Sequence, residues 1–161
     1  MSFGTMTIQS VELTVLTSRM YPCSVQESDT QAGWRFFLYA GPPPEESSVD
    51  EDMKTVFMNG VNLYADDEPI PLPDMPDFTG LEFTLKEPYS PVSGETYFTL
   101  DPGEALDVSD VALRFLEKKD ACYHISLTAQ VHHFAKEPTP LLYDGWIEVT
   151  DGVQAGSGEQ E

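Results

Sequence analysis

The chain has 161 residues, of which 28 are acidic and 8 are lysine or arginine, so its formal net charge at pH 7 is −20. Hydrophobic residues still make up 40% of it, which is typical of a protein that folds. A surface this negative repels nucleic acid and anionic membranes, and it attracts basic proteins and metal cations. The length predicts a single domain over residues 1–150, followed by a mobile tail at 151–161 that is rich in Gly, Ser and Glu.

The N-terminus lacks the positively charged and apolar segments of a secretory signal peptide. No window of the sequence approaches the roughly 18 apolar residues of a membrane span. We therefore expect a soluble, cytoplasmic protein. In that compartment Cys23 and Cys122 are expected to be reduced.

Apolar residues recur with a period of two along most of the chain, which is typical of β-strands. In a first strand at about 6–17, Val11, Leu13 and Val15 share one face. The next strand, at 34–40, is apolar on both faces, which indicates a central strand covered on both sides. A loop at 41–52 follows, because its prolines and carboxylates cannot continue a buried ladder.

An Asn-Gly pair lies between two short alternating runs further along. Asn59 and Gly60 supply the positive φ angles of a two-residue type I′ turn, so the sequence predicts a hairpin with Met58 opposite Val61. A proline-rich acidic stretch at 66–77 is then expected to interrupt the sheet.

That stretch carries Ile70, Leu72 and Met75 among its prolines, which a disordered linker would lack. We expect it to pack across a sheet edge or against a partner. The three predicted strands that follow lie at 81–85, at 96–100 and in the segment VSDVALRFLEKK at 108–119, whose end at 117–120 forms a charged turn to the next strand.

The clearest amphipathic strand is that next one, which begins at Cys122. Its apolar face holds Tyr123, Ile125, Leu127, Ala129 and Val131. A last strand is predicted at about 142–150. The pattern as a whole predicts an all-β fold, an antiparallel β-sandwich of about eight or nine strands, with a partly open β-barrel as the alternative.

Catalytic patterns are weak in this sequence. His124 and His132 share one strand face but lie roughly 26 Å apart at about 3.3 Å per residue, so they cannot bind one metal ion together. His132 and His133 are adjacent, and their side chains therefore point to opposite faces of the strand. No G-x-S-x-G elbow and no phosphate-binding glycine loop is present. Cys122 precedes His124 by two residues, a spacing common by chance. We predict no enzymatic activity and no catalytic residues.

Calcium is the cofactor that the acidic loops could hold, because it prefers oxygen ligands. The candidate loops are 49–52, 65–68 and 107–110. None has the spacing of an EF-hand, and solvated charge is the simpler interpretation. We therefore predict neither a metal nor another cofactor.

Acidic residues are concentrated in the middle of the chain. Residues 45–104 contain 15 of them against two basic ones, Lys54 and Lys86, and aromatic and apolar residues lie in between. This mixture is typical of protein interfaces. The predicted partner-binding residues are Asp50, Glu51, Asp52, Tyr64, Asp66, Asp67, Glu68, Asp74, Met75 and Asp77.

The sequence thus favours a non-enzymatic acidic module that binds a basic protein, such as an inhibitor or immunity protein that blocks a basic toxin or nuclease. The alternative is a structural subunit of a larger assembly, such as a virion or secretion apparatus, which would self-associate. A calcium-dependent binding module is the third hypothesis.

Overall fold

A computed structural model describes residues 3–25, 28–43, 51–73, 77–91 and 94–150, with the backbone alone for 23–32 and 66–69. These residues form nine strands and one short helix. The elements are β1 (Gly4–Ile8), β2 (Val11–Val25), β3 (Ser28–Ala40), α1 (Glu51–Val56), β4 (Val61–Ile70), β5 (Glu82–Leu85), β6 (Thr99–Asp101), β7 (Leu106–Lys119), β8 (Cys122–Val131) and β9 (Thr139–Val149).

Eight of the strands close into an antiparallel barrel. The order is β1, β2, β3, β4, β6, β7, β8, β9, with β9 paired back to β1, and β5 is an extra strand on the edge of β7. One short parallel contact joins β2 to β9. The predicted all-β antiparallel fold of about nine strands is confirmed. Its strands form a closed barrel, with which the alternative of a partly open barrel is compatible.

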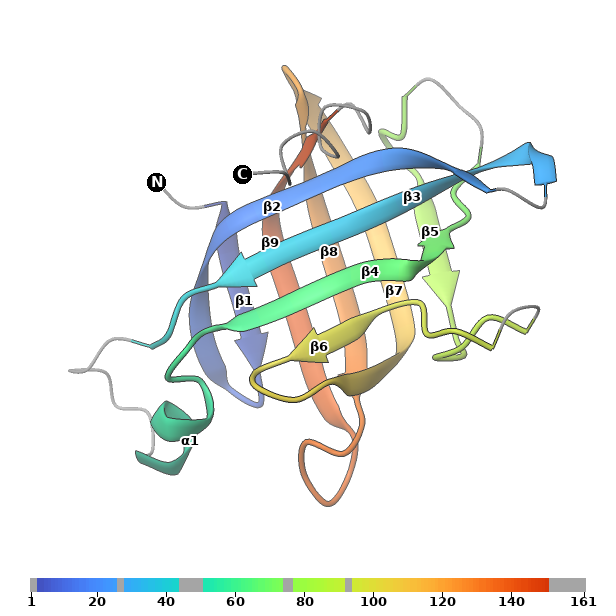
Figure 1. Ribbon diagram of the computed structural model, residues 1–161. Coiled ribbons are helices and arrows are strands. Elements are labelled where there is room, and N and C mark those ends of the chain that lie inside the picture. The colour runs from blue at the N-terminus through green and yellow to red at the C-terminus, as the bar shows by residue number, and fades with distance from the viewer. Residues whose placement is uncertain (1–2, 26–27, 44–50, 74–76, 92–93, 151–161) are drawn as a thin grey trace, which may run out of the picture.

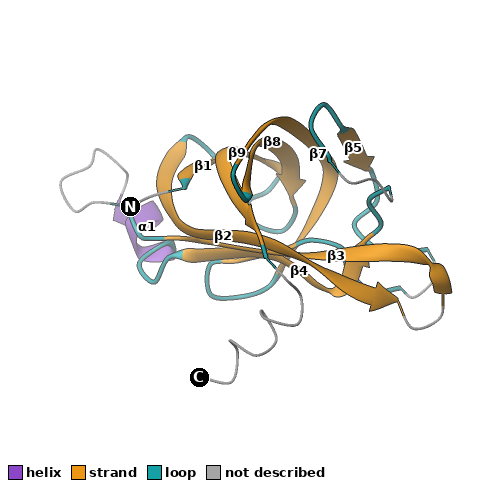
Figure 2. Ribbon diagram, turned by 90° about the horizontal axis from the view of Figure 1, so that it is seen from above, coloured by secondary structure: helices purple, strands orange, loops and turns teal. Residues whose placement is uncertain are grey.

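Figure 1 shows why strand alternation does not distinguish a sandwich from this barrel. The strands β2, β3 and β4 cross in front of β7, β8 and β9 as two packed layers, and their inner faces share one interior. An eight-stranded barrel has an interior just wide enough for its own side chains. Figure 2 shows the strands curving around that interior, with α1 and β5 on opposite sides of the molecule.

The faces predicted for β2 and β8 are those that the barrel buries. Val11, Leu13 and Val15 are buried on β2, and the odd-numbered residues from Tyr123 to Val131 are buried on β8. The first predicted strand is nevertheless two strands, because Gln9 and Ser10 both have positive φ and turn the chain between β1 and β2.

The predicted hairpin at Asn59 and Gly60 is wrong. The residues before it form α1 and a turn, and β4 pairs with β3 instead, with Val61 opposite Ala40. Met53 and Phe57 are four residues apart and pack inward together on one side of the helical turn, which outweighs the apparent alternation. Gly60 does have positive φ, but it ends this turn by donating from its N–H to the Phe57 carbonyl at 2.9 Å.

The acidic stretch at 66–77 does not interrupt the sheet where it was predicted to. The strand β4 continues to Ile70, which pairs with Trp34, although the ladder is irregular between Trp34 and Phe36. This irregularity accommodates Pro69, which has no N–H to donate. Ile70 and Leu72 are buried in the core, as expected of a packed segment.

The barrel is narrowly closed between β4 and β7. The strand β6 alone bridges them, and only two of its residues pair with β7. Beyond β6, residues 77–81 cover the seam: Phe78 packs against Trp34, Phe115 and Tyr123. The Tyr123 hydroxyl accepts from the Phe78 N–H at 2.9 Å. This seam segment (residues 77–81) therefore completes the core where the ladder is open.

Candidate partner-binding pocket

The candidate site begins at an irregularity in β7. Leu106 and Val108 point inward before it, whereas Val111 and Leu113 point inward after it, so the buried residues change from even to odd positions. An inward face can change parity only where one strand has an extra residue. The register shift between Ser109 and Ala112 is that bulge.

The bulge gives Asp110 a φ of 53°, a left-handed conformation that aspartate tolerates better than most residues. Its N–H donates to the Lys86 carbonyl at 3.0 Å, which fixes the segment after β5 beside β7. Ser109 is only 4% exposed, whereas the Asp110 side chain is exposed.

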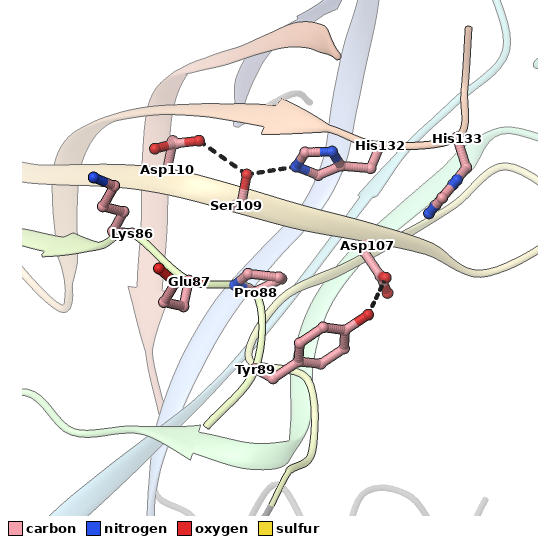
Figure 3. A pocket seen from close by; sticks show the side chains of 9 residues that line it. All are labelled: Lys86, Glu87, Pro88, Tyr89, Asp107, Ser109, Asp110, His132 and His133. Atoms are coloured by element: carbon pink, nitrogen blue, oxygen red, sulfur yellow. Dashed lines mark hydrogen bonds between the residues drawn. The ribbon is translucent and has the colours of Figure 1, made fainter. Parts of the chain in front are cut away.

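The segments that meet here line an open pocket of about 390 Å³, which we call the Asp107 pocket (Figure 3). The first follows β5, the second is the bulged part of β7 and the third follows β8. The lining residues are Lys86, Glu87, Pro88, Tyr89, Asp107, Ser109, Asp110, His132 and His133.

Hydrogen bonds hold the inner side of this pocket in place. The Ser109 hydroxyl donates to Asp110 Oδ2 at 3.0 Å, and its oxygen lies 2.6 Å from His132 Nε2. Because the Ser109 hydroxyl proton is used in the bond to Asp110, His132 Nε2 is the donor in the bond to the Ser109 oxygen. On the other side, the Tyr89 hydroxyl donates to Asp107 Oδ2 at 2.5 Å (Figure 3).

A serine, a histidine and an aspartate thus meet, although the sequence carries no nucleophile elbow. Their order differs from that of a catalytic triad, in which the carboxylate contacts the imidazole and the imidazole accepts the serine proton. Here Asp110 contacts Ser109, and the described residues supply no carboxylate bond to His132. The arrangement positions polar groups at the pocket wall.

The lining of the pocket carries a net negative charge. Three carboxylates, from Glu87, Asp107 and Asp110, line it against the single ammonium of Lys86. The pKa of Tyr89 is raised, first by its hydrogen bond to Asp107 and then by the charge of that carboxylate. Tyr89 therefore stays neutral beside Asp107 at physiological pH.

The acidic sequence at 107–110 is not the calcium loop that was considered for it, because it lies within β7. Within the described ranges, no group of three or more His, Cys, Asp or Glu side chains is placed to hold a metal ion. His124 lies on the outer wall instead, with Nε2 2.8 Å from Asp144 Oδ1 and its ring stacked on Trp146.

Of the partner-binding residues predicted from the sequence, those whose side chains the structure describes do not line the Asp107 pocket. Glu51 and Asp52 are exposed in the first turn of α1, and Tyr64 is half-buried on β4, opposite Phe37 and Thr99. Figures 1 and 2 place α1 and the connection from β4 to β5 on different sides of the barrel, so the first two are not neighbours of Asp77.

Asp77 belongs to the seam segment. Its Oδ1 accepts from the Thr79 N–H and hydroxyl and from Tyr123, and the Thr79 bonds are the main reason that its pKa is lowered. The side chains of Asp66, Asp67 and Glu68 on β4 are outside the described set. Asp50, Asp74 and Met75 lie outside the described residues altogether, so their role stays a prediction.

Sequence reasoning missed Asp107, Ser109, Asp110 and His132 as one site. The parity change within β7 is a local signal that could have located the bulge. No local sequence pattern indicates that these four residues lie beside the segment after β5, because that proximity depends on the pairing of β5 and β8 with β7.

Comparisons with protein-family models, curated proteins and solved structures give no match for this chain. Within the described part of the chain, no helix is long and apolar enough to cross a membrane. The case for a function therefore depends on the charge and geometry of the pocket.

Proposed function

We propose that this chain is a non-enzymatic protein-binding module, and that its Asp107 pocket receives a lysine or arginine side chain of a basic partner. The observation that carries the proposal is the charge of the cavity, which has three carboxylates and one ammonium. A cationic side chain would restore the balance in a place where part of its hydration is lost and the attraction is stronger than in bulk water.

The pocket suits both parts of such a side chain. Asp107 and Asp110 offer acceptor oxygens to the charged head, and arginine can use two of its N–H groups on one carboxylate. The rings of Tyr89 and His133 offer surface to the aliphatic stem.

The charge of the whole molecule supports the same class of partner. A net charge of −20 accelerates the approach of a basic protein at low ionic strength. One biological form of this activity is an inhibitor or immunity protein that covers the cationic substrate-binding cleft of a toxin or nuclease, with its carboxylates in the places of substrate phosphates.

Fluorescence anisotropy with a labelled nonapeptide tests this proposal. The arginine probe carries arginine at its second, fifth and eighth positions among serines, and the citrulline probe replaces each arginine by its neutral analogue. We expect the arginine probe to bind at about 20 mM NaCl and to weaken steeply by about 200 mM, because salt screens the attraction. The citrulline probe should bind at least about tenfold more weakly.

Two variants with equal charge then separate the pocket from the general surface. The pocket variant combines Glu87→Gln, Asp107→Asn and Asp110→Asn. We expect it to bind the arginine probe about tenfold more weakly than the control variant does, because it loses the local acceptors as well as the charge.

The control variant combines Glu12→Gln, Glu117→Gln and Asp120→Asn, which are exposed residues outside the pocket. Equal losses of probe affinity in the two variants would contradict a role of the pocket.

Replacing Asp66, Asp67 and Glu68 by their amides tests the residues predicted from the sequence with the same probe. An unchanged association rate for that variant at low salt would remove them from the recognition surface.

A further inference from the structure

A second pocket, which has a volume of about 320 Å³ and is open to solvent, lies beside α1. We call it the apolar cavity, because most of its lining is apolar. It is formed by α1, by the connection from β6 to β7 and by the loop that follows β8. Its lining residues are Met53, Val56, Pro102, Gly103, Glu104, Leu106, His133 and Phe134.

Packing contacts between aromatic side chains hold the walls of the apolar cavity together. Phe57, which directly follows α1, is fully buried and stacks on Phe134 with ring centroids 5.8 Å apart and planes at 17°. This contact ties the helix to the loop after β8. Leu106 is buried at the start of β7, whereas Val56 is 36% exposed.

His133 borders both cavities, so they are adjacent. Its φ of 70° is left-handed, and it turns the chain from the end of β8 toward Phe134. In an extended chain, side chains two residues apart point the same way and lie about 7 Å apart. One segment of a partner can therefore enter the Asp107 pocket with one side chain and the apolar cavity with another.

We propose that the two cavities form one bipartite site for an extended segment in which a leucine-like side chain lies within two residues of a lysine or arginine. The inference rests on the proposed function and adds the partner's sequence character to it. The charge at the apolar cavity supports it, because the carboxylate of Glu104 is among the residues that line that cavity. An apolar side chain flanked by basic residues matches that surface.

A second copy of this chain fits the bipartite site poorly. It carries the same net charge of −20 and would bring carboxylates toward carboxylates. A basic segment of another protein gains attraction at the Asp107 pocket and apolar burial beside it.

The test compares the arginine probe with a leucine probe that has the same arginines but leucine at its third and seventh positions. Anisotropy is measured with the wild-type chain and with Val56→Thr, which replaces a methyl group by a hydroxyl in nearly the same shape. Leu142→Thr is the control, because Leu142 is 42% exposed on β9 and lines neither cavity. We expect the leucine probe to bind the wild type about tenfold more tightly than the arginine probe.

We expect Val56→Thr to remove most of that gain and Leu142→Thr to keep it. Equal binding of the two probes to the wild type would overturn the bipartite site and leave the proposed function standing. Failure of both probes to bind at low salt would overturn the proposed function itself. If Val56→Thr still binds the leucine probe about tenfold more tightly than the arginine probe, the leucine lies outside the apolar cavity. If sedimentation shows that the wild-type chain dimerises and that Val56→Thr weakens the dimer, a second copy occupies the apolar cavity. Either result contradicts the inference.

Discussion

Both the backbone conformation and the surrounding atoms restrict position 60 to glycine. Its φ is +78°, and a Cβ atom there would lie 2.5 Å from the Tyr39 hydroxyl and 2.6 Å from the Ala40 carbonyl oxygen. Gly80 has a similar φ of +89°, but a Cβ atom there meets nothing within 4 Å. The two glycines separate the effect of the backbone from that of crowding.

We expect Gly80→Ala to lower the free energy of unfolding by about 1 to 2 kcal/mol, because the left-handed backbone alone is unfavourable for alanine. Gly60→Ala should lower it by about 2 kcal/mol more, because Tyr39 and the backbone of β3 must also shift. Urea denaturation measures both. Equal losses in the two variants would mean that the contacts around Gly60 relax without strain.

Tyr143 predicts a loss of stability at alkaline pH. It is fully buried, its hydroxyl donates to the Trp146 carbonyl at 2.6 Å, and burial raises its pKa to about 12. Below pH 10, tyrosine is neutral in both the folded and the unfolded chain, so the stabilisation is complete. Between pH 10 and about 12 the unfolded chain loses this proton first, and the free energy of unfolding falls.

Tyr143→Phe cannot lose that proton, and every other titrating group is common to both proteins. We expect the free energy of unfolding of the wild type to fall relative to that of Tyr143→Phe as the pH rises above about 10. Urea denaturation at a series of pH values measures the difference. Parallel curves up to pH 12 would show that the Tyr143 pKa is not raised.

At the scale of the elements, alternation predicts best where a strand has one wet and one dry face. The inward face of β8 could be predicted from the sequence alone, because a register slip of one residue there would expose every apolar side chain of that face. Alternation fails at Met53 and Phe57, where a single helical turn also buries apolar residues. Short helices and bulges depend on tertiary contacts that a local pattern does not contain.

The seam segment is the element whose attachment is easiest to test. Tyr123→Phe keeps the ring contacts with Phe78 and Phe115 but removes the acceptor for the buried Phe78 N–H. Leaving that N–H without a partner costs about 1 to 3 kcal/mol. We expect faster hydrogen exchange at Gly80 and Leu81, whose amides donate to the Phe115 and Phe78 carbonyls.

Leu127→Ala is the contrasting change, because Leu127 is buried in the barrel wall rather than at the seam. It should lower the free energy of global unfolding by about 2 to 5 kcal/mol through lost burial and a cavity. Exchange in the β8 amides should therefore accelerate in Leu127→Ala, whereas exchange at Gly80 and Leu81 should stay nearly unchanged in that variant, because opening the seam leaves Leu127 packed. If Leu127→Ala accelerates both regions equally, the seam does not open separately.

For the whole molecule, the amino-acid sequence predicts the class of fold and the sign of the surface charge. Barrel closure is harder to predict, since it depends on a three-residue strand, β6, that bridges β4 and β7. The Asp107 pocket is harder still. Its residues come from positions 86–89, 107–110 and 132–133, and only the assembled register brings them together.

The net charge of −20 predicts that moderate salt stabilises the fold, because ions screen the repulsion among carboxylates. We expect the melting temperature to rise by a few degrees between about 20 mM and about 500 mM NaCl. Differential scanning calorimetry measures it, and KCl serves as the control for effects specific to one cation. A melting temperature that falls or stays constant would show that the carboxylates do not repel one another appreciably in the folded chain.

The central claim is that the Asp107 pocket receives a cationic side chain, and amide chemical shifts test it most directly. Titrating the isotope-labelled chain with the arginine probe at low salt should move the resonances of residues 107–110 and 132–133 most, with saturation at one equivalent per chain. The citrulline probe should move them little. Shifts of similar size over the whole acidic surface, without saturation at the pocket, would contradict the claim.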